Sequence, residues 1–164
     1  MKNLMRSNIY LPMAAMILTA ALAVPAAEQK QVPFKGTFQG HDTDIGSTNT
    51  TVTVLTMGTG IGTLVGQFSF TQTVTVDTTG HDTGSAQWFA ANKDSISTTI
   101  TGSGQVIDPI LFLIEIEEVH TITGGTGRFA GAQGSFAVKR LASGITFLTS
   151  GSYEGTITSP GAAH

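Results

Sequence analysis

The sequence predicts a single all-β domain, folded as an antiparallel β-barrel of about eight strands. Apolar and polar residues alternate with a period of two along much of the chain, most regularly between Thr63 and Asp77. Short turn-forming runs separate the alternating stretches, and no amphipathic helical pattern occurs. A sheet of consecutive hairpins must close or double over, because open edges promote aggregation. We therefore expect a closed barrel that encloses packed side chains or one small ligand.

Composition agrees with this fold class and excludes several functions. The 164 residues suffice for one domain, and the 20 glycines with only 12% charged residues are typical of a β protein with tight turns. There is no cysteine, which excludes disulfides, thiolate nucleophiles and cysteine metal sites. The net charge is −3, and Lys139-Arg140 is the only adjacent basic pair, so nucleic acid is not an expected partner.

The first 26 residues have the pattern of a secretory signal peptide. Lys2 and Arg6 precede an uncharged run from Ile9 to Val24, and small residues follow up to Ala27. An uncleaved membrane anchor is the alternative, but the run of about 16 residues is short for a membrane span and contains Pro12. We expect an exported protein, periplasmic or extracellular, without stable membrane insertion after cleavage, whose barrel domain spans residues 32–159.

Eight segments have the composition or alternation of strands. They are Val32–His41, Thr51–Met57, Thr63–Asp77, Ser85–Ala91, Ser95–Gly102, Ile110–Ile122, Ser135–Leu141 and Ile145–Ile157. Turns are expected at Gly58–Gly60, Gly80–Asp82, Asn92–Asp94, Asp108-Pro109, Gly124-Gly125 and Ala142–Gly144.

The run from Gly125 to Ala130 matches the pattern G-x-G-x-x-A, which is close to a dinucleotide-binding fingerprint. That fingerprint requires a helix after the glycines, since the helix N-terminus carries the pyrophosphate. Here another strand pattern, Gly134 to Val138, follows instead. The glycines are better explained by a turn that needs positive φ and by close strand crossing.

The same run carries a resemblance to a known family. Residues 124–134, GGTGRFAGAQG, resemble the late hairpin of the allene oxide cyclase and dirigent superfamily. Weaker matches follow in the family's order, at Phe34–Phe38, Gly66–Phe68, Ala91–Asp94 and Gly151–Gly155. The resemblance implies an eight-stranded calycin-like barrel with an apolar cavity, assembled as a homodimer or homotrimer. In plants such barrels cyclise an unsaturated epoxide or direct the coupling of phenolic radicals, but this chain has neither a cysteine nor an acidic residue in its first strand before Asp42.

Glu118 and His120 are the candidate catalytic residues. The alternation places them on the same face as Ile114, Ile116 and Ile122. A partly desolvated Glu with a neighbouring His at the inner rim of a barrel can exchange protons. The alternative is that the strand leaves the core here and both residues meet solvent, or that this face is outside.

The candidate ligand-binding residues are Phe68, Phe70, Arg140 and Tyr153. Phe68 and Phe70 lie on the apolar face of the most regular strand, and Arg140 and Tyr153 also fall on apolar faces. A buried Arg or Tyr can bind a carboxylate or carbonyl of a ligand. Arg140 is near a strand end, where it can instead extend its head to solvent.

The sequence Gly-His-Asp-Thr occurs twice, at residues 40–43 and 80–83. Imidazole and carboxylate ligands suit Zn or Mn, but no third ligand is fixed and Asp is an ordinary turn residue. We therefore predict no metal and no other cofactor.

Three functions remain open. The first is an exported barrel that binds a small apolar ligand. The second is a cofactor-independent isomerase or cyclase acting on an apolar substrate, and the third is a structural barrel with a filled interior. Cavity volume separates the third from the others, and buried ionisable groups in a cavity favour the second.

Overall fold

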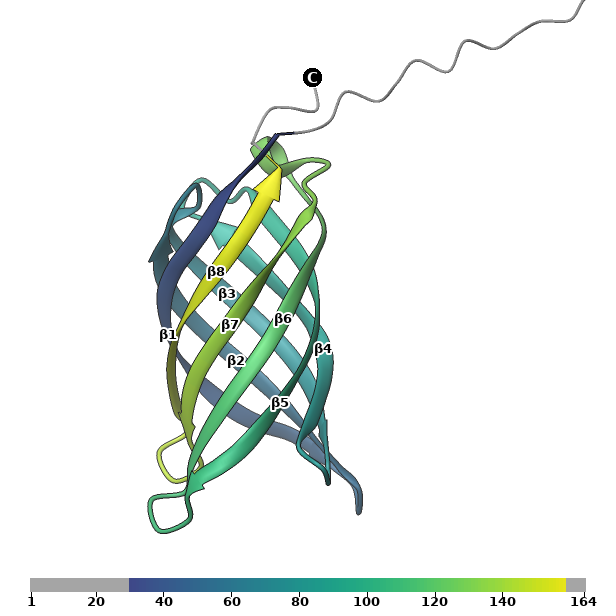
Figure 1. Ribbon diagram of the computed structural model, residues 1–164, viewed down its shortest axis with the longest axis vertical. Helices are drawn as coiled ribbons and strands as arrows, with labels where there is room; N and C mark the ends of the chain where they lie inside the picture. Colours follow the sequence, from purple (N-terminus) through teal and green to yellow (C-terminus); the bar gives the residue numbers. More distant parts are fainter. Residues whose placement is uncertain (1–29, 159–164) are drawn as a thin grey trace, which may run out of the picture.

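The computed structural model describes residues 30–158, which form a closed antiparallel barrel of eight strands (Figure 1). The strands are β1 (Gln31–Ser47), β2 (Thr51–Gly62), β3 (Gly66–Asp77), β4 (His81–Ala90), β5 (Ser95–Asp108), β6 (Leu113–Gly125), β7 (Gly134–Ser143) and β8 (Leu148–Thr158). Each strand pairs with the next, and β8 pairs with β1 to close the sheet. The predicted fold class is confirmed, whereas the expected signal peptide lies outside the described residues. Within residues 30–158 no helix is long and apolar enough to cross a membrane.

The alternation of side chains assigns the faces of the strands as predicted. In β3, Phe68, Phe70, Gln72 and Val74 point into the barrel and are buried. In β1, Phe34 and Phe38 are likewise buried between exposed outward-facing neighbours. Shifting the pairing of a strand by one residue would turn its apolar side chains outward to solvent. The apolar residues therefore fix the register.

The turn expected at Gly58–Gly60 is wrong, because these residues lie inside β2. Gly58, Gly60 and Gly62 alternate on the inner face, where a Cβ at Gly58 would overlap the ring of Phe70 and a Cβ at Gly60 the ring of Phe68. The glycines therefore make room for aromatic side chains of the neighbouring strand. The actual turn follows at residues 63–65 and contains Leu64 with φ 64°.

Several strands extend further than expected, including β2, which ends at Gly62 rather than Met57, and β5, which ends at Asp108 rather than Gly102. Two further extensions concern the candidate site. β1 continues to Ser47 rather than ending at His41, and β4 already begins at His81, where a turn was expected. The turn before β4 occupies residues 78–80, ending at Gly80 with φ 85°. Both extensions matter for function, because they bring Asp42 and Asp82 inside the barrel.

The glycine-rich run leads from β6 to β7, as predicted, but the turn expected at Gly124-Gly125 is wrong, because both glycines lie in β6 and pair with β5. After β6 comes a single turn of 3-10 helix, η1 (Gly127–Phe129), and the chain then returns as β7. Gly127 and Gly131 have φ of 57° and 72°, which explains the glycines at these positions. Phe129 is buried against the core, and within the described residues no α-helix follows that could carry a phosphate.

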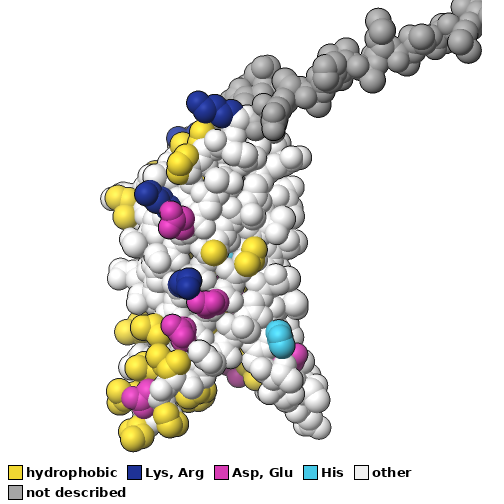
Figure 2. All heavy atoms as spheres, in the orientation of Figure 1, with side chains coloured by type: hydrophobic (Ala, Val, Ile, Leu, Met, Phe, Trp, Pro, Cys, Tyr) yellow, Lys and Arg dark blue, Asp and Glu magenta, His cyan; other side chains and the backbone are white. Residues whose placement is uncertain are grey.

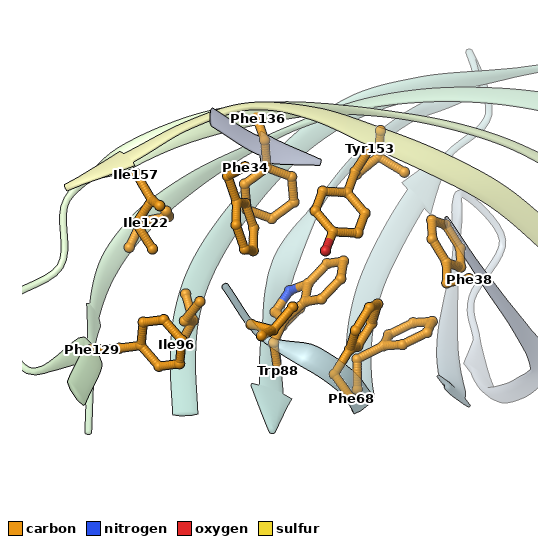
Figure 3. Packing of buried hydrophobic residues seen from close by; sticks show 14 of the residues in the cluster. Phe34, Phe38, Phe68, Trp88, Ile96, Ile122, Phe129, Phe136, Tyr153 and Ile157 are labelled. Atoms are coloured by element: carbon orange, nitrogen blue, oxygen red, sulfur yellow. The ribbon is translucent and has the colours of Figure 1, made fainter. Parts of the chain in front are cut away.

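Aromatic residues fill one half of the barrel (Figure 3). Trp88 lies at the centre, with ring centroids 5.0 Å from Phe68, 5.3 Å from Phe70 and 5.3 Å from Phe136. Tyr153 packs 5.1 Å from Trp88 and 4.9 Å from Phe34. These rings bury large apolar areas in edge-to-face and stacked arrangements, so this half is a packed core.

Candidate functional site

The other half of the barrel contains a cavity of about 450 Å³. It lies at the end where the loops β1–β2, β3–β4, β5–β6 and β7–β8 meet, opposite the end where β1 begins and β8 ends. Its walls are formed by the apolar side chains Val52, Val54, Val74, Val76, Ile114 and Ile116, and Phe112 and Phe147 stand at the mouth. Asp42, Asp82 and Arg140 form a charged floor. Apolar walls with a few convergent polar groups are characteristic of small-molecule sites.

A layer of polar side chains separates this cavity from the aromatic core. Seven of the eight strands contribute to it, with Asp42, Thr56, Gln72, Thr98, Glu118, His120, Arg140 and Thr149. We call these residues the polar layer. Buried polar groups are tolerated when they are paired, and each of these side chains makes at least one hydrogen bond to another member.

Arg140 and Glu118 are the centre of the polar layer. Arg140 donates from Nη2 to Oε1 of Glu118 and from Nη1 to Oδ2 of Asp42, both at 3.3 Å. Gln72 adds a hydrogen bond of 2.7 Å to Oε1 of Glu118. Burial by itself would raise the pKa of Glu118, but His120 and the positive charge of Arg140 outweigh burial and lower this pKa to about 2. Glu118 is thus a carboxylate anion at neutral pH.

Asp82 differs from the other carboxylates of the site. It is 4% exposed, and its Oδ1 atom is buried without a hydrogen-bond partner among the described residues. Burial, together with the nearby negative charge of Glu118, raises the pKa of Asp82 to about 6. The floor of the cavity therefore holds a carboxyl group that changes protonation near neutral pH.

Glu118 and His120 lie inside the barrel, so the interpretation that both meet solvent is wrong. They are 1% and 0% exposed, and Nε2 of His120 is 3.8 Å from Oε2 of Glu118. Nδ1 of His120 pairs with Oγ1 of Thr98 at 3.1 Å, and the imidazole stacks on Phe136 with centroids 4.9 Å apart. Neither residue lines the cavity, so this pair would act on a bound molecule only through Arg140 or Asp82.

The structure separates the four residues considered for ligand binding. Arg140 lines the cavity, and it does not extend to solvent, since it is 6% exposed. Phe68, Phe70 and Tyr153 belong to the packed aromatic core on the other side of the polar layer. Burial raises the pKa of Tyr153, whose hydroxyl oxygen has no hydrogen-bond partner among the described residues.

Asp42 and Asp82 were not recognised as site residues from the sequence. The alternation would have found them, because Asp42 continues the inward series of Phe34 and Phe38, and Asp82 begins the series of Ala86 and Trp88. The expected strands ended before Asp42 and began after Asp82, so the two residues were considered only as turn residues or metal ligands.

The two copies of the Gly-His-Asp-Thr motif lie in β1 and at the start of β4. Strand alternation turns Asp42 and Asp82 inward while His41 and His81 are exposed on the outer face. No group of three or more His, Asp or Glu side chains suited to a metal ion occurs between residues 30 and 158. Each copy of the motif thus delivers one carboxyl group to the cavity.

A wider hollow of about 1050 Å³ lies on the outer wall of the barrel, across β1 to β4. It is bordered largely by exposed side chains such as Thr37, Gln39, Thr59 and Gln67, so it is a surface depression rather than an enclosed site. It holds none of the paired carboxylates described above.

Comparisons with known proteins give one structural likeness. No protein-family model matches this chain, and no curated protein matches its sequence. The structure of the pterocarpan synthase dirigent protein GePTS1 matches with 11% sequence identity and a TM-score of 0.31, over 88% of this chain and 99% of that chain. The strand pairing defines the fold class as a closed, eight-stranded, antiparallel barrel. Aromatic side chains fill one half of this barrel, and the other half contains the cavity.

Proposed function

We propose that this protein is an exported barrel that binds one small, mainly apolar molecule in the cavity above the polar layer. The observation that carries this proposal is the cavity of about 450 Å³ with apolar walls and a charged floor. Sites of roughly 300–1,000 Å³ with few polar groups are typical for small ligands. Export is supported by the N-terminal pattern of Lys2, Arg6 and the uncharged run that follows.

The floor favours a ligand that carries a hydrogen-bond donor. The Arg140 guanidinium is already engaged by Glu118, Asp42 and Thr149. Asp82, in contrast, lines the cavity, and its buried Oδ1 atom has no hydrogen-bond partner among the described residues. A hydroxyl or amine group on an otherwise apolar molecule would give the Asp82 carboxyl group a hydrogen-bond partner at the cavity floor, because a buried carboxyl group is costly without one.

The test is native mass spectrometry of the protein purified from the exported fraction of its own host. Wild type should retain a bound small molecule. Ala142→Phe, which places a ring into the cavity, should lose it, whereas Ala137→Phe, on the outer face of the same strand, should retain it. Ligand-free spectra for all three proteins would overturn the proposal and favour a structural barrel.

The second candidate function is a cofactor-independent isomerase or cyclase. One observation favours it: two buried carboxyl groups both lie against Gly102, and the pKa of Asp82 is raised to about 6 whereas that of Glu118 is lowered to about 2. Two carboxyl groups with pKa values moved in opposite directions are suited to acid–base chemistry. Turnover of the co-purified molecule should then be lost in Asp82→Asn and retained in Ala137→Phe, and should depend on a group with a pKa near 6.

A further inference from the structure

Exposed apolar side chains gather at the mouth of the cavity. They lie on the loops β5–β6 and β7–β8, and Figure 2 shows them as the yellow cluster at the lower left, over the loop tips seen in Figure 1. The residues are Ile110, Leu111, Phe112, Ile145, Phe147 and Leu148, and we call this set the mouth crown. Ile110 is 86% exposed, and each of the others is at least 45% exposed. A contiguous exposed apolar patch of this kind marks an interaction surface.

Hydrogen bonds and packing hold the loops of the mouth crown in place. The backbone N–H of Gly144 donates to the carbonyl of Phe112 at 2.9 Å, and the N–H of Asp42 donates to the carbonyl of Phe147 at 2.8 Å. The ring of Phe112 occupies the space that a Cβ at Gly144 would need. Phe112 and Phe147 have φ of 46° and 59°, a conformation that bulky residues rarely adopt. Strained residues that persist are characteristic of functional loops, and here both present a ring at the mouth.

Several backbone donors of the crown loops are satisfied within the loops. Oδ1 of Asp108 accepts from the N–H groups of Ile110 and Leu111 at 2.8 and 2.9 Å. In the other loop, Ser143 accepts from Ile145 and Thr146 through Oγ and from Phe147 through its carbonyl. Each N–H group that is paired within the loop lowers the cost of moving the loop toward a lipid phase, where water does not supply partners.

We propose that the mouth crown docks peripherally on a lipid bilayer, with Ile110, Leu111 and Ile145 entering the apolar phase. The crown borders the mouth of the apolar cavity, so a docked barrel receives an apolar molecule directly from the lipid. A second copy of the chain seated on the crown would instead cover the mouth. This route for the ligand rests on the proposed binding function, whereas the docking itself does not.

Charge predicts the lipid that the crown prefers. Residues 108–112 and 143–148 contain no Lys or Arg, and the only ionisable side chain in these loops is Asp108. Attraction to anionic headgroups therefore contributes nothing, and docking depends on apolar burial. Vesicles of phosphatidylcholine should bind at least as well as vesicles that contain phosphatidylserine, with little dependence on salt.

The absence of cysteine makes a site-specific test direct. Full-length protein is labelled with an environment-sensitive fluorophore at Leu111→Cys or at Ala91→Cys. Ala91 lies in the turn between β4 and β5, at the end of the barrel where β1 begins, so its label reports contact made through the opposite end. On addition of phosphatidylcholine vesicles, the emission of the Leu111 label should shift to the blue and become protected from an aqueous quencher. The Ala91 label should not change.

Further substitutions in the labelled protein provide the second measurement. In Leu111→Cys protein, the additional change Ile110→Ser with Ile145→Ser should weaken the vesicle-dependent shift at least about tenfold in lipid concentration, because two exposed apolar side chains no longer insert. Ile61→Ser with Val119→Ser also removes two exposed apolar side chains, but from the outer wall, and should leave the shift unchanged.

Three outcomes would overturn the docking proposal. They are an unchanged Leu111 label with vesicles, a shift that is insensitive to the Ile110 and Ile145 changes, and a shift that depends on protein concentration without vesicles, which would indicate self-association. Native mass spectrometry tests independently whether the cavity retains a small molecule. Lipid docking without any retained molecule would contradict the proposed binding function and leave the docking proposal standing.

Discussion

Arg140 donates hydrogen bonds to both carboxylate oxygens of Glu118 inside the barrel, from Nε to Oε2 at 3.4 Å and from Nη2 to Oε1 at 3.3 Å. The side chain of Arg140 is 4% exposed and that of Glu118 is 0% exposed. The pair therefore holds two charges away from water, at the boundary between the aromatic core and the cavity. Removing one partner destabilises the protein more than it would in a surface ion pair, because it leaves an uncompensated buried charge.

Arg140→Met should lower the free energy of unfolding by about 3–5 kcal/mol, since Glu118 and Asp42 would remain buried without their cation. Urea unfolding at pH 7 measures this loss. Lys139→Met is the matched control, because Lys139 pairs with Glu117 at 2.7 Å on the exposed outer face of the same strands. It should hardly move the midpoint of unfolding. Equal losses in both variants would contradict the central role of the Arg140–Glu118 pair.

Asp82 should make the folded state less stable as the pH rises, whereas an ordinary ion-paired carboxylate makes it more stable. Its pKa in the folded protein, about 6, lies above its ordinary value of 3.8. Asp82 therefore stabilises the folded state fully below about pH 4, and this contribution is lost as the pH rises through 6. Asp82→Asn should gain stability over wild type by on the order of 2 kcal/mol between pH 4 and pH 7.

The measurement is urea unfolding of both proteins at several pH values. Asp44→Asn, at an exposed position of the same end of the barrel, should run parallel to wild type. Glu118 has the reverse sign: its lowered pKa contributes stability above pH 4.5 that is lost as the pH falls toward 2. An Asp82→Asn curve that stays parallel to wild type from pH 4 to pH 7 would show that Asp82 is not desolvated.

The hydroxyl of Tyr153 limits the residue that β2 can carry at position 62. A Cβ at Gly62 would overlap this oxygen, which is buried and has no hydrogen-bond partner among the described residues. Gly62→Ala should cost about 1–3 kcal/mol through overpacking. Tyr153→Phe should be neutral or slightly stabilising, because it removes an unpaired buried hydroxyl. In the double variant the cost of Gly62→Ala should fall, and additive losses would contradict the proposed clash.

The two halves of the barrel should respond differently to the same truncation. Ile96 is 0% exposed in the aromatic half, so Ile96→Ala should cost about 2–5 kcal/mol through lost contacts and a new void. Ile114 faces the existing cavity, where fewer contacts are lost, and Ile114→Ala should cost about half as much or less. Thermal or urea unfolding of the two variants compares them directly. A larger loss for Ile114→Ala would mean that the cavity half supplies the stabilising core.

The sequence allowed the closed barrel and the faces of its strands to be predicted, because alternation records which side chains leave water. Strand ends were harder to place. Gly58 and Gly60 resembled a turn, although they are inner-face positions that accommodate Phe70 and Phe68 on the next strand. That role depends on cross-strand neighbours, which a local pattern does not contain.

The site was predicted in part for a similar reason. Alternation placed Glu118, His120 and Arg140 inside, but it did not show that a layer of paired groups would separate them from Phe68, Phe70 and Tyr153. The pairing of Arg140 with Asp42 joins residues 98 positions apart in the sequence. The left-handed conformations of Phe112 and Phe147 were likewise not predictable, since nothing in those residue types favours them.

The strand order has a practical consequence for handling the molecule. β1 begins beside the end of β8, with Gln31 paired to Thr158, at the filled end of the barrel. A tag, a carrier domain or a sensor surface joined at that end is therefore separated from the mouth by the length of the barrel (Figure 1). If the protein is immobilised through that end, the mouth of every copy points toward the solution. The protein is therefore suited to surfaces on which all copies must have the same orientation.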